Sequence, residues 1–340
     1  MRSFASDNNS GVHPLILEAI AKANVDHAVG YGSDPWTEQA ENKLKEVFGD
    51  QAAPFFVFNG TGANSVALQA ITRSFNSILC AETAHIYVDE CGAPARLTGA
   101  TVTPIPTPDG KLTPALIKDK LVNFGVCHHP QPKAVYISQV SELGTVYTIE
   151  EVREIADLLH AHNMYLHMDG ARLANACVYL NCDMRSLTVD AGVDILSFGG
   201  TKNGMMMGEA VISFRPEITE NLQYFRKQSA QLASKMRYLS AQFIPYLENN
   251  LWFENAAKAN VAAAKLYDVL KQYPEIHFTQ KPETNQLFFT APAEVAMALR
   301  EKYYFYFWNE ANYEIRLVTS WDTTGEDIAR FEQDLNDAFN

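Results

Sequence analysis

A single lysine, Lys202, lies between two apolar segments of this sequence. DILSF at 194–198 has the pattern of a buried strand and is followed by two glycines, and MMMGEAVISF at 205–214 is apolar again. Burial lowers the pKa of a lysine and leaves a nucleophilic amine of the kind that forms a Schiff base. The alternative is a lysine in a surface loop after a Gly-Gly turn.

Two other turns carry groups that complement such an amine. FNGTGANS at 58–65 puts small residues directly before a helix pattern, where backbone N–H groups and the helix dipole favour phosphate. It is neither a P-loop nor a GxGxxG motif, so the alternative is a tight turn capped by Asn59 or Thr61. Asp169, in HMDGAR, ends an apolar strand pattern, where a carboxylate is costly unless it meets a cation. Its alternatives are an ion pair with Arg172 and a helix N-cap.

The order of these three features makes them more informative together than singly. The turn, the strand-end aspartate and the lysine lie on successive strand–helix units, and Asp169 precedes Lys202 by 33 residues, about one such unit. Pyridoxal phosphate requires this set: a phosphate anchor, an acid for the pyridinium nitrogen and an imine-forming amine. We therefore expect pyridoxal 5'-phosphate as the cofactor.

Alternating strand and helix patterns between about residues 35 and 245 must position these groups. Strands are expected at 53–58, 76–81, 100–106, 133–139, within 164–172 and at 194–198, and helices at 37–49, within 59–71 and at 112–124 and 148–163, the last opened by a Thr-x-x-Glu capping box. This alternation predicts an α/β fold with a mostly parallel sheet covered by helices on both faces. Ligands of such sheets bind beyond the carboxyl ends of the strands.

A change of pattern near residue 250 predicts a second, smaller α+β domain. A long helix at 252–272 precedes aromatic, β-branched strand patterns at 285–291, 303–308 and 313–321, and a helix closes the chain at 325–340. We expect a large domain at 1–248, in which residues 1–35 contribute to the active site, and a small domain at 249–340. A cleft between the two domains is expected.

Composition narrows the possible settings. Of the 340 residues 47% are apolar and 20% are charged, as in ordinary globular proteins, and the net charge of −13 argues against nucleic acid as a partner. The five cysteines form no CxxC pair, which predicts a reducing compartment with neither disulfides nor zinc. Neither a membrane-spanning segment nor an apolar signal region is visible, so a cytoplasmic location is expected.

Six segments in the same order resemble the threonine aldolases of the beta-eliminating lyase family, over nearly the whole chain. HMDGAR is similar to the family's H-[VM]-D-G-A-R, GTGAN to its phosphate turn, and AHIYVDECGA to A-H-x-Y-x-x-E-x-G-G. YGSDP is similar to Y-G-x-D-P, EIRLVTSWD to R-L-V-T-x-x-D, and SDNNSG lies where the family has an S-D opening. The resemblance implies the aspartate-aminotransferase-like fold of type I pyridoxal phosphate enzymes.

The resemblance also implies roles around the cofactor. Lys202 would hold it as a Schiff base, and Asp169 would keep its pyridine nitrogen protonated. Gly60 and Thr61 would bind the phosphate. His85 would stack on the ring and is a candidate base; without its matching motif it would read as a satisfied core histidine.

A second set of residues is implied for the substrate carboxylate. Arg172, which is also expected near the cofactor, would act with Arg316 and Ser6, because a guanidinium fork suits a planar anion. For Arg316, on an otherwise apolar strand, the alternative is an edge-strand or snorkelling arginine.

Contacts between subunits are implied as well. Tyr31 would line the pocket, in many relatives from a neighbouring subunit, and Arg237 in RKQSAQLASKMR (226–237) would reach the partner's phosphate. The alternatives are a surface turn tyrosine and a solvated helix face. The resemblance implies a homo-oligomer, a tetramer made of active-site pairs.

One segment departs from the family pattern. Many relatives carry a second active-site histidine in E-N-T-H-N after the central strand, whereas this chain has SQVSELGTVY at 138–147. His128 and His129 lie before that strand, so the role is not transferred to them. The identity of the base that receives the β-hydroxyl proton stays open.

The activity that the resemblance implies is retro-aldol cleavage of L-threonine, L-allo-threonine and related β-hydroxy-α-amino acids to glycine and an aldehyde. The first alternative is another pyridoxal phosphate lyase, a racemase or a transaminase acting on a small amino acid. A cysteine desulfurase is less favoured, because no loop cysteine is identified as a nucleophile. An alternative of a different class is a non-catalytic module that binds a nucleotide at the 58–65 turn.

Overall fold

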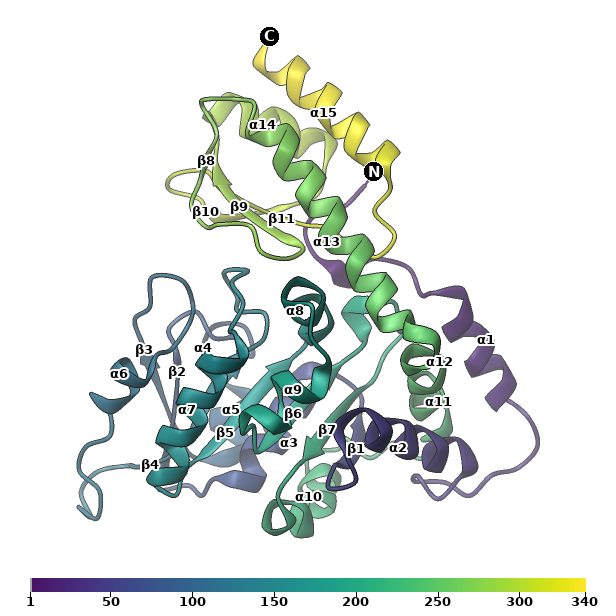
Figure 1. The fold of residues 1–340 in the computed structure, drawn as a ribbon, viewed down its shortest axis with the longest axis vertical. Helices are drawn as coiled ribbons and strands as arrows, with labels where there is room; N and C mark the ends of the chain where they lie inside the picture. Colours follow the sequence, from purple (N-terminus) through teal and green to yellow (C-terminus); the bar gives the residue numbers. More distant parts are fainter. Residues whose placement is uncertain (1) are drawn as a thin grey trace.

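A seven-stranded sheet organises the larger part of the molecule in the computed structural model, which describes residues 2–340 (Figure 1). Met1, the first residue of the expected large domain, lies outside the described residues. The strand order is β1-β7-β6-β5-β4-β2-β3. The strands are β1 Ala53–Val57, β2 Asn76–Ala81, β3 Thr101–Ile105, β4 Gln131–Ser138, β5 Tyr165–Gly170, β6 Ile195–Gly199 and β7 Glu209–Ser213.

The direction of the strands confirms the expected mostly parallel sheet. The pairs β3/β2, β2/β4, β4/β5 and β5/β6 are parallel, whereas β7 runs antiparallel to both β6 and β1. Every residue of β2, β6 and β7 is buried, as expected for a sheet that helices cover on both faces. The carboxyl ends of β4, β5 and β6 therefore meet at one edge of the sheet.

Helices surround this sheet, and half of its α-helices begin at a side-chain cap. The capping box predicted at Thr148 and Glu151 forms at the start of its helix. The helices of this part are α1 Pro14–Ala23, α2 Pro35–Phe48, α3 Gly60–Ile71, α4 His85–Val88, α5 Ala93–Thr98, α6 Pro114–Lys118, α7 Ile149–Ala161, α8 Leu173–Leu180, α9 Met184–Leu187, α10 Pro216–Gln228, α11 Arg237–Ser240 and α12 Phe243–Leu247, with short 3-10 helices η1 Asp7–Asn9, η2 Val189–Ala191, η3 Thr201–Asn203 and η4 Glu248–Asn250.

The predicted helix at 112–124 was wrong in its second half. Helix α6 ends at Lys118, because the amides of Lys120 and Leu121 bond to carbonyls three residues back, in tighter turns. Asn123 then takes a left-handed conformation with φ of 63°, which no helix of L-residues continues.

The smaller part contains an antiparallel four-stranded sheet of order β10-β11-β9-β8. Its strands are β8 His277–Phe278, β9 Gln286–Thr290, β10 Tyr306–Asn309 and β11 Glu314–Val318, and its helices are α13 Leu251–Leu270, α14 Ala293–Lys302 and α15 Gly325–Phe339. Figure 1 shows α13 running from the large part, beside α12, up to the small sheet. Phe4, from the N-terminus, packs in the core of the small part, 5.6 Å from Phe331 between ring centroids. Within residues 2–340, no helix has the length and hydropathy of a membrane span.

Candidate active site

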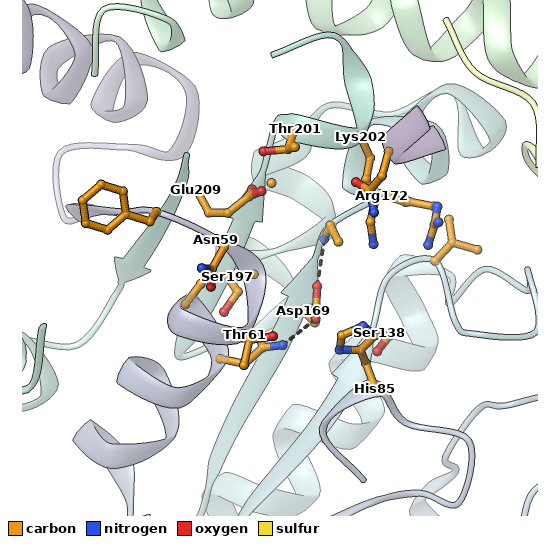
Figure 2. Close-up of a pocket in the computed structure, with 18 of the residues that line it drawn as sticks. Asn59, Thr61, His85, Ser138, Asp169, Arg172, Ser197, Thr201, Lys202 and Glu209 are labelled. Carbon is orange, nitrogen blue, oxygen red and sulfur yellow. Dashed lines mark hydrogen bonds between the residues drawn. The ribbon is translucent and has the colours of Figure 1, made fainter. Parts of the chain in front are cut away.

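A cavity of about 370 Å³ lies beyond the carboxyl ends of β4, β5 and β6, beside the N-terminus of α3 (Figure 2). This is the position expected for a ligand of such a sheet. The predicted site residues that line it are Gly60, Thr61, His85, Asp169, Arg172 and Lys202. These groups come from the N-terminus of α3 and from the ends of β2, β5 and β6 or the segments that follow them.

Lys202 lies in η3, directly after the buried strand β6. The turn requires glycine at two positions, since a side chain at Gly200 would collide with Met205 and Gly204 has φ of 101°. The Nδ2 of Asn203 donates to the Tyr246 hydroxyl at 3.0 Å and to a backbone carbonyl at 2.8 Å, which fixes the turn. The Lys202 side chain is left to line the cavity.

The surroundings of Lys202 favour the uncharged amine. Burial and the positive charge of Arg172 lower its pKa, although the negative charges of Asp7, Asp169 and Glu209 oppose this shift. Among residues 2–340, no hydrogen bond or ion pair holds the Lys202 Nζ. The alternative of an ordinary surface lysine therefore does not describe this residue.

Asp169 ends β5 as a hydrogen-bonded carboxylate. Its Oδ2 accepts from Asn64 Nδ2 and from the Tyr136 hydroxyl, both at 2.8 Å, and its Oδ1 accepts from the backbone N–H of Ala171 at 2.9 Å. Burial would raise the pKa of Asp169, but the Lys202 charge and the bond from Asn64 outweigh it, so the pKa lies below its usual range. Asp169 is thus a buried, ionised acid.

The ion pair of Asp169 with Arg172, one alternative from the sequence, is wrong. Arg172 instead donates from Nε and Nη2 to the two carboxylate oxygens of Asp7, at 2.7 and 2.8 Å. Burial alone would raise the pKa of Asp7, yet the Arg172 charge and hydrogen bond keep it lowered. Asn285, from the small part, also donates to Asp7 at 3.0 Å, so this pair joins the two parts of the molecule.

Arg316 lies on β11, outside the residues that line the cavity. Its Nε and Nη2 both donate to Oε1 of Gln286, at 3.1 and 2.7 Å, and its guanidinium lies 5.6 Å from the Trp308 ring centroid. Burial and the charge of Arg172 lower the pKa of Arg316 to about 10. The positive charges of Arg172 and Arg316 thus repel one another where the small part meets the cavity.

The turn before α3 leaves backbone amides at the N-terminus of this helix that could bind an anion. Asn59 caps the helix, since its Oδ1 accepts from Gly62 N at 2.8 Å. The alternative interpretation of this segment, a turn capped by Asn59, is therefore confirmed. Within residues 2–340, the amides of Gly60 and Thr61 have no partner, and a side chain at Gly60 would enter open space. The two amides and the helix dipole point a positive field into the cavity.

His85 begins α4 and lines the cavity with a side chain that is 38% exposed, so it is not a core histidine. Its Nδ1 lies 2.8 Å from Oε1 of Glu90, and the same oxygen accepts from Asn64 at 2.8 Å. The bond to Glu90 raises the pKa of His85 and the charge of Asp169 supports this, against the effect of burial. Asn64 therefore connects His85 and Glu90 to Asp169.

Besides Arg316, three predicted residues do not line the cavity. Ser6 caps η1 by accepting from a backbone N–H at 3.1 Å. Tyr31 is 56% exposed, with Lys227 Nζ 5.3 Å from its ring centroid. Arg237 donates to backbone carbonyls of residues 25 and 26 and lies over the Trp36 ring. Contact of Tyr31 and Arg237 with a neighbouring subunit stays a prediction.

Sequence reasoning missed two acids that line the cavity. Glu142 lies in the 138–147 segment, where the family pattern has a histidine. Its Oε1 accepts from Ser138 Oγ at 2.6 Å and from His85 N at 2.8 Å. Glu209 accepts from Gly200 N at 3.1 Å, and burial raises its pKa to about 7. The signal for Glu209 was visible as a lone acid in the apolar run 205–214.

Within residues 2–340, no group of three or more His, Cys, Asp or Glu side chains is placed to hold a metal ion. The five cysteines are free thiols. The groups that meet in the cavity are the Lys202 amine, several carboxylates, the Arg172 guanidinium, the His85 imidazole and helix amides.

Comparison with known proteins agrees with this arrangement. The model of the beta-eliminating lyase family matches residues 3–293. A low specificity L-threonine aldolase of Pseudomonas aeruginosa (strain PAO1) is 40% identical over 98% of this chain and 97% of that protein, and one of Escherichia coli K12 is 29% identical over 97% and 96%. The structure of a Leishmania major threonine aldolase superposes with a TM-score of 0.94 at 31% identity and full coverage of both chains. An alanine–glyoxylate aminotransferase of Nostoc sp. shares the fold alone, with a TM-score of 0.72 at 15% identity over 100% of this chain and 95% of that one.

Proposed function

Because the chain belongs to the beta-eliminating lyase family, we propose that it is a threonine aldolase that depends on pyridoxal 5'-phosphate. Its substrates would be L-threonine, L-allo-threonine and related β-hydroxy-α-amino acids, cleaved to glycine and an aldehyde. The observation that carries the proposal is that Lys202, Asp169 and the free amides of Gly60 and Thr61 face one cavity. The names of the Pseudomonas and Leishmania relatives support the choice of reaction.

The donor set of the cavity fits this cofactor. The amides of Gly60 and Thr61 would hold its phosphate, because they point unpartnered from a helix N-terminus. Asp169, kept ionised, would pair with the pyridine nitrogen, and His85 would lie against the ring. Lys202 would hold the cofactor covalently. When bound, the cofactor supplies an electron sink for the pair released from the Cα–Cβ bond.

The chain itself would bind and orient the substrate. Arg172 and Arg316 would hold the carboxylate, which fixes the Cα–Cβ bond relative to the cavity. Because the pKa of Lys202 is lowered, its Nζ would be an uncharged amine able to accept a proton once the substrate amine has displaced it. His85 and Glu142 are the side chains of the cavity that could receive the β-hydroxyl proton directly or through a water.

A coupled assay tests the reaction. The purified protein with pyridoxal phosphate is mixed with L-threonine, and acetaldehyde is measured with alcohol dehydrogenase and NADH. L-allo-threonine and phenylserine extend the test, the latter through benzaldehyde. Absence of aldehyde from all three would refute the aldolase proposal. Ammonia with a keto acid would instead indicate β-elimination or transamination, and the enantiomer would indicate racemisation.

We also propose a homotetramer in the cytoplasm, with a large domain at 1–248 and a small one at 249–340. The exposed Tyr31 and the distance of Arg237 from its own cavity support a neighbouring subunit that uses them. The scattered free cysteines are compatible with a reducing compartment. Light scattering after size exclusion measures the assembly, and a monomer would contradict this part of the proposal.

A further inference from the structure

We propose that Glu142 is the catalytic base that receives the β-hydroxyl proton of the substrate as the Cα–Cβ bond breaks. This assignment rests on the proposed aldolase function. Glu142 lies four residues after Ser138, the last residue of β4, and its side chain lines the cavity. The chain carries no histidine in this segment, and the Glu142 carboxylate is the ionisable group of the segment that lines the cavity.

The carboxylate is held by one oxygen and leaves the other available. Both recorded bonds, from Ser138 Oγ at 2.6 Å and from His85 N at 2.8 Å, fall on Oε1. Within residues 2–340, no other residue donates a hydrogen bond to Oε2; the amide of Glu142 itself also acts on the carboxylate, which borders the cavity. A carboxylate fixed in this way presents one free acceptor to a hydroxyl donor.

The position of the anchors places Glu142 on the substrate side. Figure 2 shows Ser138 and His85 next to each other, away from Asn59 at the turn before α3. The negative charge of Glu142 also acts on Arg316, one of the groups proposed for the substrate carboxylate. The Glu142 carboxylate, bonded to Ser138 and to the His85 amide, therefore lies on the His85 side of the cavity, away from the turn before α3.

His85 is less suited to the task. Its Nδ1 is bonded to Glu90, and the raised pKa favours the imidazolium, which cannot accept a proton. Burial raises the pKa of Glu142, against the bonds from Ser138 and the His85 amide, which makes it a better base than an exposed carboxylate. Within residues 2–340, Glu142 forms no ion pair, and the hydrogen bonds from Ser138 and the His85 amide are what stabilise its charge.

The proposed step balances without any further reactant. The O–H bond breaks and its proton moves to Oε2 of Glu142, while the O–H electron pair becomes the second bond of the aldehyde carbonyl. The Cα–Cβ bond breaks, and its pair stays with the glycine fragment. A proton then adds to Cα and Glu142 loses its own, so the sum is amino acid to aldehyde and glycine.

The variant Glu142→Gln separates the role of Glu142 as a proton acceptor from its role as a hydrogen-bond acceptor. Glutamine can still accept from Ser138 and His85 N through its carbonyl oxygen, but it cannot take a proton. We expect cleavage of L-threonine to fall at least about 100-fold, the usual contribution of a general base. Exchange of the glycine α-proton in deuterated water, followed by NMR, needs the cofactor site but no β-hydroxyl base, and should stay within about threefold of wild type.

Two further variants complete the experiment. Glu142→Ala opens space for a small carboxylate, and added formate should restore at least about tenfold of the lost cleavage. Glu283→Gln is the matched control, because Glu283 likewise accepts from a backbone amide of this segment, Val146 N at 2.8 Å, but does not line the cavity. It should cleave threonine at the wild-type rate.

The outcomes distinguish the two proposals. Undiminished cleavage by Glu142→Gln, equal loss of cleavage and of glycine exchange, or no rescue by formate would each overturn the role of Glu142. Wild-type protein that yields no aldehyde would overturn the aldolase function itself, and the Glu142 assignment with it.

Discussion

Burial shifts the pKa values of Lys202 and Asp169, the two central residues of the cavity, in opposite directions. It lowers the pKa of Lys202 and would raise that of Asp169, but hydrogen bonds and the lysine charge keep Asp169 ionised. An amine that readily loses its proton thus faces an acid that stays charged. This pairing is what a covalently held, ring-protonated cofactor needs.

Asp169→Asn tests the charge of that acid. Asparagine keeps the size and one acceptor but removes the negative charge that would stabilise a protonated ring. We expect the cleavage rate to fall by about 10²–10³, as for loss of one preorganised electrostatic group. Steady-state kinetics with Asp190→Asn as control, an exposed aspartate paired with Arg185, would measure this. A loss below about threefold would contradict the role of Asp169.

His167 makes a prediction about pH. It is buried on β5, and burial lowers its pKa from 6.5 to about 4. Between these values the unfolded chain binds the proton and the folded chain does not, so stability falls as pH falls. From about pH 7.5 to pH 5 this residue should remove about 2 kcal/mol from the free energy of unfolding. Urea titrations of wild type and His167→Gln at both pH values give the difference, and equal pH dependence would refute it.

At the scale of elements, the N-terminus of α3 is both a structural cap and a proposed anion site. Asn59→Ala removes the cap on Gly62 N and lets the first turn fray. We expect a loss of about 1 kcal/mol in the free energy of unfolding, and a similar effect on phosphate binding would raise the cofactor Kd about fivefold.

The control for this prediction is Thr113→Ala, at the cap of α6. Thr113 accepts from Leu116 N in the same way, far from the cavity residues. It should lose comparable stability without any change in cofactor affinity, measured by fluorescence titration of the apoprotein. A cofactor Kd that responds alike to both variants would count against the anion site.

Local patterns allowed prediction of most elements and of the groups that lie on them. Strand β6 with its glycine turn, the Thr148 capping box and the turn at 58–65 are all encoded by neighbouring residues. The end of α6 was mispredicted because apolar periodicity continues past Lys118, while the backbone turns at Asn123. Periodicity reports which residues are buried, and not which backbone conformation buries them.

The partners of the site residues could not be predicted from local patterns. Asp7 accepts hydrogen bonds from Arg172, which lies 165 residues later in the chain, and Asn64 donates to Asp169, which lies 105 residues later. Glu142 was missed because the groups that hold its carboxylate, Ser138 Oγ and the His85 amide, come together with it only in the folded chain. Pairings of this kind depend on the tertiary fold.

At the scale of the whole molecule, the proposed substrate site takes residues from both parts of the chain. Arg172 and Asp7 are joined to the small part through Asn285, and Arg316 comes from β11. Arg316→Lys keeps the charge but loses the fork geometry. We expect KM for L-threonine to rise at least about tenfold, with the visible absorbance of the bound cofactor unchanged.

Arg300→Ala is the matched control for Arg316. Arg300 also lies in the small part, with its guanidinium 4.7 Å from the ring centroid of Phe307, but its side chain is exposed and does not line the cavity. Its KM should equal that of wild type. An unchanged KM in Arg316→Lys and Arg316→Ala would remove Arg316 from the substrate site.

The central claim is that Lys202 holds pyridoxal phosphate, and borohydride reduction followed by peptide mass spectrometry tests it most directly. Reduction fixes the cofactor to the lysine that carries it, and the digest identifies that residue. We predict a phosphopyridoxyl group on Lys202 and on no other lysine, with no label in Lys202→Ala. A label on a different lysine, or none on the wild-type protein after incubation with pyridoxal phosphate, would contradict the account.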